Sequence, residues 1–293
     1  HTSPPQPAGG GDRNAIPLYD FPNQKVVHHF LRDVMPIRTS ALRTLGAYAN
    51  VFASESFMDE LAAAANGDPV AFRLAHLKDP RAKAVIEKVA AISGWKPGEK
   101  GDGRRGRGIA FSKYKNLACY VACVADVEVD RATGRVKVTQ VWSAIDAGLV
   151  INPTGLITQT EGGVIQSASW TLHEEVKFNR NGILSKDWAS YPIMTMPEVP
   201  KVTVELINRP DQRPSGAGEG SQGPAVAAIA QKIKTAYNEV LSEGKCLTRD
   251  LGGTCNTNQF ADAVIARLGQ QPTAMRPASY AEGAPPPATR KAI

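Results

Sequence analysis

The sequence lacks several features that would have assigned it to a simple class. No stretch approaches the roughly 20 consecutive apolar residues that a membrane-spanning helix requires. The four cysteines form no C-x-x-C, haem-attachment or iron–sulfur pattern. Aromatic residues make up only 6% of the chain, and none interleaves the most basic stretch, residues 96–107. That stretch is therefore expected to be a solvated linker and not a nucleic-acid surface.

The start of the sequence also lacks an initiator methionine and a signal-like apolar region, since it begins at His1. This predicts a processed product or a piece of a longer polypeptide. What is present describes an ordinary globular protein, with 42% apolar and 21% charged residues. The length of 293 residues is enough for one or two domains.

The cysteines fall into two pairs with different expectations. Cys119 and Cys123 lie in an apolar run that predicts a strand, where their spacing places them on one face but too far apart to bond. Packing in the core is therefore expected for both. Cys246 and Cys255 flank a Gly-Gly loop and would form a disulfide if the protein is exported. Two buried or free thiols fit the sequence equally well.

The hydrophobic pattern changes period along the chain and predicts an α+β fold with mixed sheets and packed helices. Helical spacing covers residues 51–65, and the pairs Asp68-Pro69 and Asp79-Pro80 each open a further helix with an N-cap and a first-turn proline. Alternation then replaces helical spacing. Strands are expected at residues 26–30, 108–114, 119–129, 136–145 and 202–207, with a second hairpin from 173 to about 183.

These patterns divide the chain into five segments. We expect an extended arm or linker at 1–24, a loop and helical block at 25–95, a joint at 96–107, an α+β domain at 108–243, and an irregular C-terminal tail at 244–293.

A helix is also predicted at residues 158–170, with an unusual composition. Gly162 and Gly163 lie inside it, and each costs about 1 kcal/mol relative to alanine in a helix interior. Such a cost indicates that something bulky packs closely against the helix. Close crossing of a second helix is the alternative explanation.

One carboxylate, Glu219, stands among four glycines directly before a small-residue helix. Glycine permits positive φ and close approach of a ligand, and a lone acid held there is a candidate general base. A Gly-rich surface turn that caps a helix explains the pattern equally well. Gly218, Gly220 and Gly223 also match the dinucleotide motif G-x-G-x-x-G, but residues 209–214 separate them from the preceding strand. A nicotinamide site is therefore not indicated.

Three stretches, in order along the chain, carry a family resemblance. They are Ala41-Leu-Arg-Thr-Leu-Gly46, Gln159-Thr-Glu-Gly-Gly-Val-Ile-Gln166 and Gly216-Ala-Gly-Glu-Gly220. Together they resemble the molybdopterin-binding large subunit of the xanthine oxidase/aldehyde oxidoreductase family, in the branch of isoquinoline oxidoreductase and bacterial aldehyde dehydrogenases. The resemblance spans about residues 26–241. It implies a molybdenum-hydroxylase large-subunit-like fold that is incomplete without its N-terminal part.

The resemblance also implies roles for individual residues. Glu219 is similar to the family's general base beside molybdenum, and burial of this carboxylate is expected to raise its pKa toward neutrality. The molybdenum–pterin cofactor carries the difficult chemistry while the protein positions it. No residue of this chain is assigned as a metal ligand. The residues implied to contact the cofactor are Ala41, Leu42, Arg43, Thr44, Gln159, Gly162, Gly163, Gly218, Gly220, Ser221 and Gln222.

The implied activity is oxidation of an aldehyde to a carboxylic acid, or hydroxylation of an N-heteroaromatic ring with oxygen from water. A non-catalytic assembly subunit is the alternative, because Gly220 and Ser221 stand where two prolines commonly follow the glutamate. Leu42 and Leu45 stand where purine-oxidising members carry aromatic residues, so xanthine is not the expected substrate.

The resemblance further implies partners that this chain does not contain. They are the N-terminal part of the large subunit, a small subunit with 2Fe–2S iron–sulfur clusters, and a cytochrome c or flavin subunit. A small molecule is the expected substrate. The resemblance and a Cys246–Cys255 bridge together predict a periplasmic location or the periplasmic face of the membrane, with the cytoplasm as the alternative.

Overall fold

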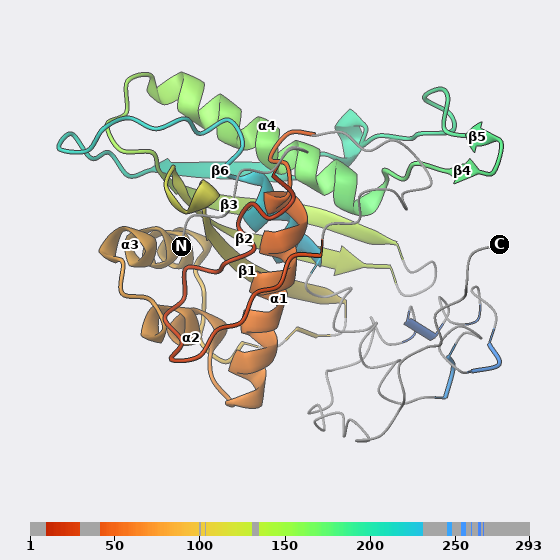
Figure 1. The fold of residues 1–293 in the computed structure, drawn as a ribbon, viewed down its shortest axis with the longest axis horizontal. Coiled ribbons are helices and arrows are strands. Elements are labelled where there is room, and N and C mark those ends of the chain that lie inside the picture. The colour runs from red at the N-terminus through yellow and green to blue at the C-terminus, as the bar shows by residue number, and fades with distance from the viewer. Residues whose placement is uncertain are drawn as a thin grey trace.

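The computed structural model describes residues 10–29, 42–99, 101–102, 104–130, 135–230, 245–247, 253–255, 259, 263–264 and 266. Helices and strands follow one another along the chain as shown in Figure 1. In order they are α1 (Ala47–Ala64), α2 (Pro69–Ala75), α3 (Pro80–Ser93), β1 (Arg105–Lys113), β2 (Tyr120–Val129), β3 (Val136–Asp146), α4 (Pro153–Leu172), β4 (Phe178–Asn179), β5 (Gly182–Ile183) and β6 (Lys201–Leu206). Short 3-10 turns lie at Tyr114–Asn116 and Met196–Glu198.

The central sheet has the order β1-β2-β3-β6, with β1, β2 and β3 antiparallel and β6 parallel to β3. Alternate residues of β2 enter two different cores. Val121 and Cys123 pack with α4 and with helical residues 222–230, whereas Ala122 and Val124 pack with α3. The sheet is therefore covered on both faces, as Figure 1 shows for α3 and α4. The predicted α+β fold with mixed sheets and packed helices is confirmed.

The helix starts follow the predicted local chemistry. Asp68 accepts hydrogen bonds from Val70 N and Ala71 N at 3.0 Å each, with a proline at the first position of α2. Asp79 caps α3 in the same way. Helix α1 begins at Ala47 and not at residue 51, because Ala47 is itself buried in the core against the sheet.

Other predictions are wrong or only partly right. Residues 26–29 form no strand, and their two valines are exposed, so no core face holds them extended. The second hairpin exists, but β4 and β5 have two residues each, and all four residues are exposed. Residue 30, the last of the expected strand at 26–30, lies outside the described residues, and so do residues 231–244, which follow the described part of the small-residue helix.

Residues 10–24 are the described part of the segment expected to be an arm or linker. They contain no helix or strand, yet they pack against the core. Asn14 and Tyr19 are buried, and the Tyr19 hydroxyl donates to Glu55 at 2.8 Å. The domain boundaries remain predictions.

An ion network lies fully inside the helical block. Arg73 on α2 has no exposed surface, and its guanidinium donates to Glu55 on α1 at 3.0 Å and to Asp59 at 2.6 Å. Glu55 also accepts from Tyr19 and from the backbone N–H of Phe111 on β1. One buried carboxylate therefore connects the N-terminal segment, two helices and the sheet.

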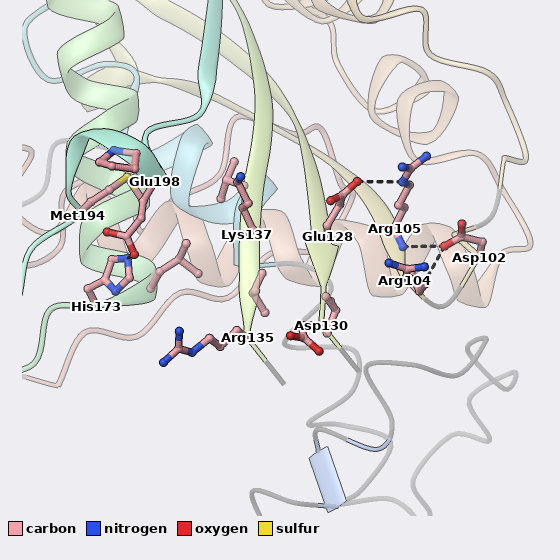
Figure 2. Close-up of a pocket in the computed structure, with 15 residues that line it drawn as sticks. Asp102, Arg104, Arg105, Glu128, Asp130, Arg135, Lys137, His173, Met194 and Glu198 are labelled. Atoms are coloured by element: carbon pink, nitrogen blue, oxygen red, sulfur yellow. Dashed lines mark hydrogen bonds and ion pairs between the residues drawn. The ribbon is translucent and has the colours of Figure 1, made fainter. Parts of the chain in front are cut away.

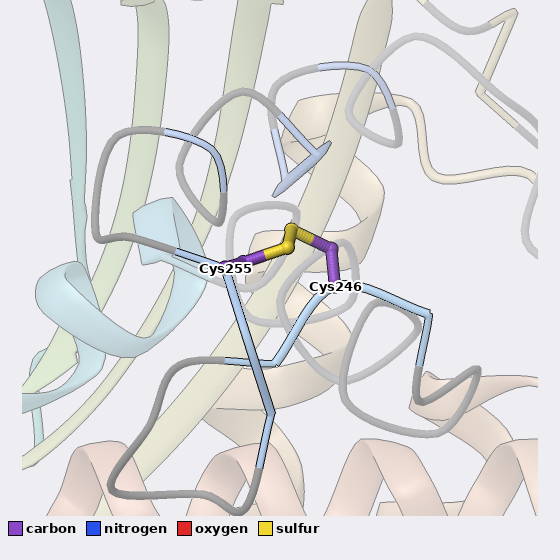
Figure 3. Close-up of a disulfide and its surroundings, with 2 residues drawn as sticks. All are labelled: Cys246 and Cys255. Atoms are coloured by element: carbon purple, nitrogen blue, oxygen red, sulfur yellow. A yellow bond between two sulfur atoms is a disulfide. The ribbon is translucent and has the colours of Figure 1, made fainter.

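The cysteines behave as two different pairs. Cys119 and Cys123 are buried and free, which confirms core packing. Cys246 and Cys255 form a disulfide, with their Cα atoms 5.5 Å apart (Figure 3). Among the described residues, none of the helices has the length and hydrophobicity for a membrane crossing.

Candidate functional site

Glu219 lies in the turn that precedes helical residues 222–230, and it is half-buried. Its carboxylate is held by two segments that are far away in the sequence. Oε1 accepts from the backbone N–H of Thr44 at 3.0 Å, and Oε2 accepts from the hydroxyl of Tyr114. Thr44 also donates its hydroxyl to the Glu219 carbonyl at 3.0 Å. The carboxylate therefore has one fixed orientation, and each oxygen keeps a further lone pair for a proton.

The pKa of Glu219 is lowered, so the expected upward shift is wrong. Burial raises the pKa, but hydrogen bonds from Tyr114 and Thr44 and the positive charges of Lys115 and Arg13 outweigh it. The reason is that this carboxylate is only half-buried and that its charged form is hydrogen-bonded. Glu219 is consequently ionised at neutral pH and able to accept a proton.

The arginine loop joins the three stretches that carry the family resemblance. Arg43 Nε donates to the Gly218 carbonyl at 2.5 Å. Its Nη2 donates to the carbonyl of Gln159 at 3.2 Å and to the Gln159 side chain at 3.3 Å. Burial lowers the pKa of Arg43, and the charge of Glu219 opposes that effect. The arginine loop, the glutamine stretch and the Glu219 turn therefore meet in the structure.

The conformation of this loop is strained. Thr44 has φ +72° and Leu45 has φ +52°, in the left-handed region that β-branched and bulky residues rarely adopt. This conformation is what aims the Thr44 N–H at Glu219. Such strain persists only where surrounding contacts hold it, and it clusters at functional sites. Leu42 is 68% exposed beside it, and Ala41 lies outside the described residues.

The predicted contact residues separate into an open group and an inner group. Gln159 and Gly162 are exposed, and Gly218 is half-buried. Ser221 and Gln222 have no exposed surface and support the turn from inside, so contact of either with a cofactor stays a prediction. Ser221 donates to the Thr160 carbonyl at 3.1 Å, and the Gln222 carbonyl accepts from Ser167.

Gly163 and Gly220 also belong to the inner group. A Cβ on Gly163 would lie 2.2 Å from Ser221 Oγ, and one on Gly220 would lie 2.3 Å from Cys119 Sγ. Their predicted role as cofactor contacts stays a prediction. Both glycines allow the Glu219 turn to pack tightly between α4 and β2.

Gly162 and Gly216 have the opposite surroundings. A Cβ on either would meet nothing within 4 Å, and one on Gly218 would meet only the Gln159 side chain at 3.5 Å. Nothing in the described part of the chain therefore requires glycine at 162, although it costs helix stability there. A group from outside that lay against α4 and the Glu219 turn would account for the glycine at this position. The open face fits a cofactor that approaches the backbone closely.

This difference between neighbouring glycines gives a testable prediction. Gly163→Ala is expected to destabilise the protein by about 1–3 kcal/mol, because the new methyl group overpacks a buried contact. Gly162→Ala is expected to stabilise the cofactor-free protein by up to about 1 kcal/mol. Urea denaturation of both variants measures whether the free energy of unfolding falls in the first and rises in the second. Destabilisation by Gly162→Ala would mean that packing within the chain explains this glycine.

A buried carboxylate that was not predicted from the sequence, Asp146, supports the segment that leads to the Glu219 turn. Asp146 at the end of β3 has no exposed surface and accepts from Arg81 at 2.5 and 3.0 Å and from Arg209 at 3.2 Å. Burial raises its pKa, but these arginines and the Gly148 N–H lower it below its ordinary value. Residues 147–149 then pair with residues 209–215, which lead directly to Glu219.

A pocket in the described part of the chain lies elsewhere, at the ends of β1, β2 and β3 beside the C-terminal end of α4 (Figure 2). Its charges are of both signs, and several of them have partners: Arg105 donates to Glu128 at 3.0 Å, and His173 lies 3.5 Å from Glu198. None of the residues around Glu219 lines it. The mixed, partly paired charges do not select a ligand.

Comparison with known proteins decides the family. Residues 47–200, over half of the chain, match the family model described as a molybdopterin cofactor-binding domain. The chain belongs to this family. The predicted resemblance to the xanthine oxidase family of molybdenum hydroxylases is thereby confirmed. The matched range contains Gln159 and Gly162 but ends before Glu219.

Two curated relatives are similar to this molybdopterin-binding chain. One subunit of the nicotinate dehydrogenase of Pseudomonas putida is 43% identical over 237 residues, which cover 76% of this chain and 20% of the relative. The beta subunit of the isoquinoline 1-oxidoreductase of Brevundimonas diminuta is 35% identical over 207 residues, 69% of this chain and 25% of the relative. The chain therefore spans about a fifth to a quarter of these proteins.

Solved structures support the fold independently. The aldehyde oxidoreductases of Desulfovibrio gigas and Desulfovibrio desulfuricans give TM-scores of 0.54 and 0.55 at 16% and 14% identity. Each alignment covers 66% of this chain and 39% of the other. At such identity the likeness shows the fold alone.

Proposed function

We propose that the chain supplies the general base and one wall of the cofactor site of a molybdenum hydroxylase that acts on an N-heteroaromatic ring. The observation that carries this proposal is the Glu219 carboxylate, ionised and fixed by Thr44 and Tyr114 beside a face that glycines leave open. Two similar relatives are named for nicotinate and isoquinoline, both N-heteroaromatic compounds. A relative named membrane-bound aldehyde dehydrogenase is only 26% identical, so an aldehyde is the second choice.

The chain's own residues would act as follows. Gly162 and Gly218 would let the molybdenum–pterin cofactor approach the backbone, beside the exposed side chain of Gln159. When bound, the cofactor supplies the redox centre that accepts the substrate's electrons. Glu219 would take up the proton released in the reaction on a free lone pair of its carboxylate. Arg43 would keep the turn at a fixed distance from α4 through its bonds to Gly218 and Gln159.

A non-catalytic assembly role has less support from the geometry. The sequence feature that favours it is the pair Gly220 and Ser221 in place of two prolines. Both residues are buried, Gly220 packs closely beside Cys119, and Ser221 donates to the Thr160 carbonyl, so packing holds this turn in place of prolines. The rest of the large subunit, an iron–sulfur subunit and a cytochrome c or flavin subunit remain the proposed partners.

A substrate screen tests the proposed reaction. The complete large subunit, co-expressed with its partner subunits, is assayed for electron transfer to a dye with nicotinate, isoquinoline and an aliphatic aldehyde. Molybdenum and pterin are quantified in the same preparation. Turnover of an N-heterocycle with bound molybdenum is expected. Turnover of the aldehyde alone, or a preparation that never takes up molybdenum, contradicts the proposal.

We also propose that the chain works in an oxidising compartment, because Cys246 and Cys255 are bonded. Thiol titration of the denatured protein, purified from its native source without reductant, should find only Cys119 and Cys123 free. Four titratable thiols would contradict export and favour the cytoplasm.

A further inference from the structure

We propose that Tyr114 is a positioning residue which, supported by Arg13, holds the carboxylate of Glu219 in its ionised form and in one orientation. This inference deepens the proposed function, since it concerns the same base. Neither residue was found from the sequence, and neither belongs to the three stretches that carry the family resemblance.

Tyr114 contacts the Glu219 carboxylate directly. Tyr114 is 4% exposed, and its hydroxyl donates to Glu219 Oε2. The same hydroxyl oxygen accepts from Arg13 Nη1 at 3.0 Å, and the Arg13 guanidinium lies 5.8 Å from the centre of the Tyr114 ring. A hydroxyl that accepts from a cation becomes a stronger donor on its other side. The chain Arg13–Tyr114–Glu219 therefore favours the carboxylate over the carboxylic acid.

A strained turn after strand β1 places Tyr114 beside Glu219. Strand β1 ends at Lys113, and Lys115 and Asn116 then adopt φ values of +57° and +56°. Asn14, itself at φ +61°, donates to the Lys113 carbonyl and accepts from Lys115 N, both at 2.8 Å. The two left-handed residues of this turn are thus held by a third, Asn14, which lies about 100 residues away in the sequence. A tight connection between β1 and β2 does not by itself require this strain.

The Tyr114 hydroxyl keeps its proton at neutral pH. Burial and the bond to Glu219 raise the pKa of Tyr114 to about 12, so the tyrosine keeps its proton and acts only as a donor. Within the described part of the chain, the charged or titratable groups that interact with Glu219 are Arg13, Arg43, Tyr114, Lys115 and Cys119. The three cations favour the carboxylate, and the buried thiol of Cys119 stays neutral because burial raises its pKa to about 12.

The test measures the pKa of Glu219 in the cofactor-free full chain. Protein labelled with carboxyl-13C glutamate is titrated by NMR, and Glu219→Gln identifies the Glu219 signal. Tyr114→Phe is expected to raise the Glu219 midpoint by about one pH unit or more, because a hydrogen bond to the charged form is lost while burial remains. In the loaded enzyme, the acidic limb of the pH profile of kcat should move upward by the same amount, since protonated Glu219 cannot act as a base.

Tyr120→Phe is the matched control. Tyr120 is 3% exposed and donates to Asp79 at 2.8 Å, so the same hydroxyl group is lost from a part-buried tyrosine–carboxylate bond away from Glu219. The titration midpoint of Glu219 is expected to stay unchanged in this variant. If Tyr114→Phe does not fold, Arg13→Met decides in its place, with a smaller upward shift expected.

An unchanged or lowered Glu219 midpoint in the folded variant would overturn the inference, and it would then leave Tyr114 a structural side chain only. The NMR titration does not depend on turnover. Its failure is therefore distinct from failure of the proposed function, which the substrate screen decides.

Discussion

Replacing Glu219 by glutamine is expected to lower kcat of the assembled enzyme by a factor of about 10²–10⁴, the usual contribution of a general base. Glutamine has nearly the same shape, and its single carbonyl oxygen can still accept from the Thr44 N–H, but its NH2 group cannot accept from Tyr114 and the side chain cannot take up a proton. Cofactor loading should not change, because the open face beside Gly162 is untouched. Steady-state kinetics and molybdenum content of the same sample measure both effects.

Glu174→Gln is the matched control for that experiment. Glu174 follows α4, and it accepts from the Tyr191 hydroxyl at 2.7 Å, so it repeats the tyrosine–carboxylate contact outside the site. Its kcat is expected to stay within about twofold of the wild type, because it lacks a role in proton transfer. Equal losses in both variants, or full activity of Glu219→Gln, would remove Glu219 from the mechanism.

The largest expected effect on stability comes from Arg73→Met. The variant leaves the buried carboxylate of Glu55 without its cation, which costs about 3–5 kcal/mol. Burial already raises the pKa of Glu55 against the opposing effect of Arg73. Without Arg73 that pKa rises further, so the difference from wild type should be largest at neutral pH and should shrink as the pH falls. Urea denaturation at several pH values measures this.

Arg105→Met provides the comparison with an exposed pair. Arg105 and Glu128 are bonded at 3.0 Å, but their side chains are 75% and 45% exposed. Such pairs contribute about 0–1 kcal/mol. A loss for Arg73→Met no larger than for Arg105→Met would show that the network around Glu55 does not hold the helical block together.

Local chemistry made much of the fold predictable. Asp68-Pro69 and Asp79-Pro80 combine an N-cap and a first-turn proline at adjacent positions. The starts of α2 and α3 were therefore predictable from the sequence. Alternation predicted the strand at 119–129, in which Asp126 and Glu128 are half-buried between buried apolar residues. Residues 26–29 show the limit, because apolar residues form a strand only when a partner strand is present.

The site was predictable only where its residues carry a motif. Glu219, Arg43 and Gln159 belong to such stretches, and the structure brings them together. Tyr114 and Asp146 stand in ordinary strand sequence, and their roles depend on contacts across 60 to about 100 residues. The pKa of Glu219 was mispredicted for the same reason. The direction of this pKa shift depends on hydrogen-bond donors from distant segments, which the spacing of residues along the sequence does not show.

The most direct test of the account is a crystal structure of the complete large subunit with its cofactor bound. We predict that the cofactor lies against Gly162 and Gly218, and that a carboxylate oxygen of Glu219 is within hydrogen-bond reach, about 2.6–3.2 Å, of a ligand of the molybdenum. A structure in which another part of the protein covers this face, with the molybdenum out of reach of Glu219, would contradict the account.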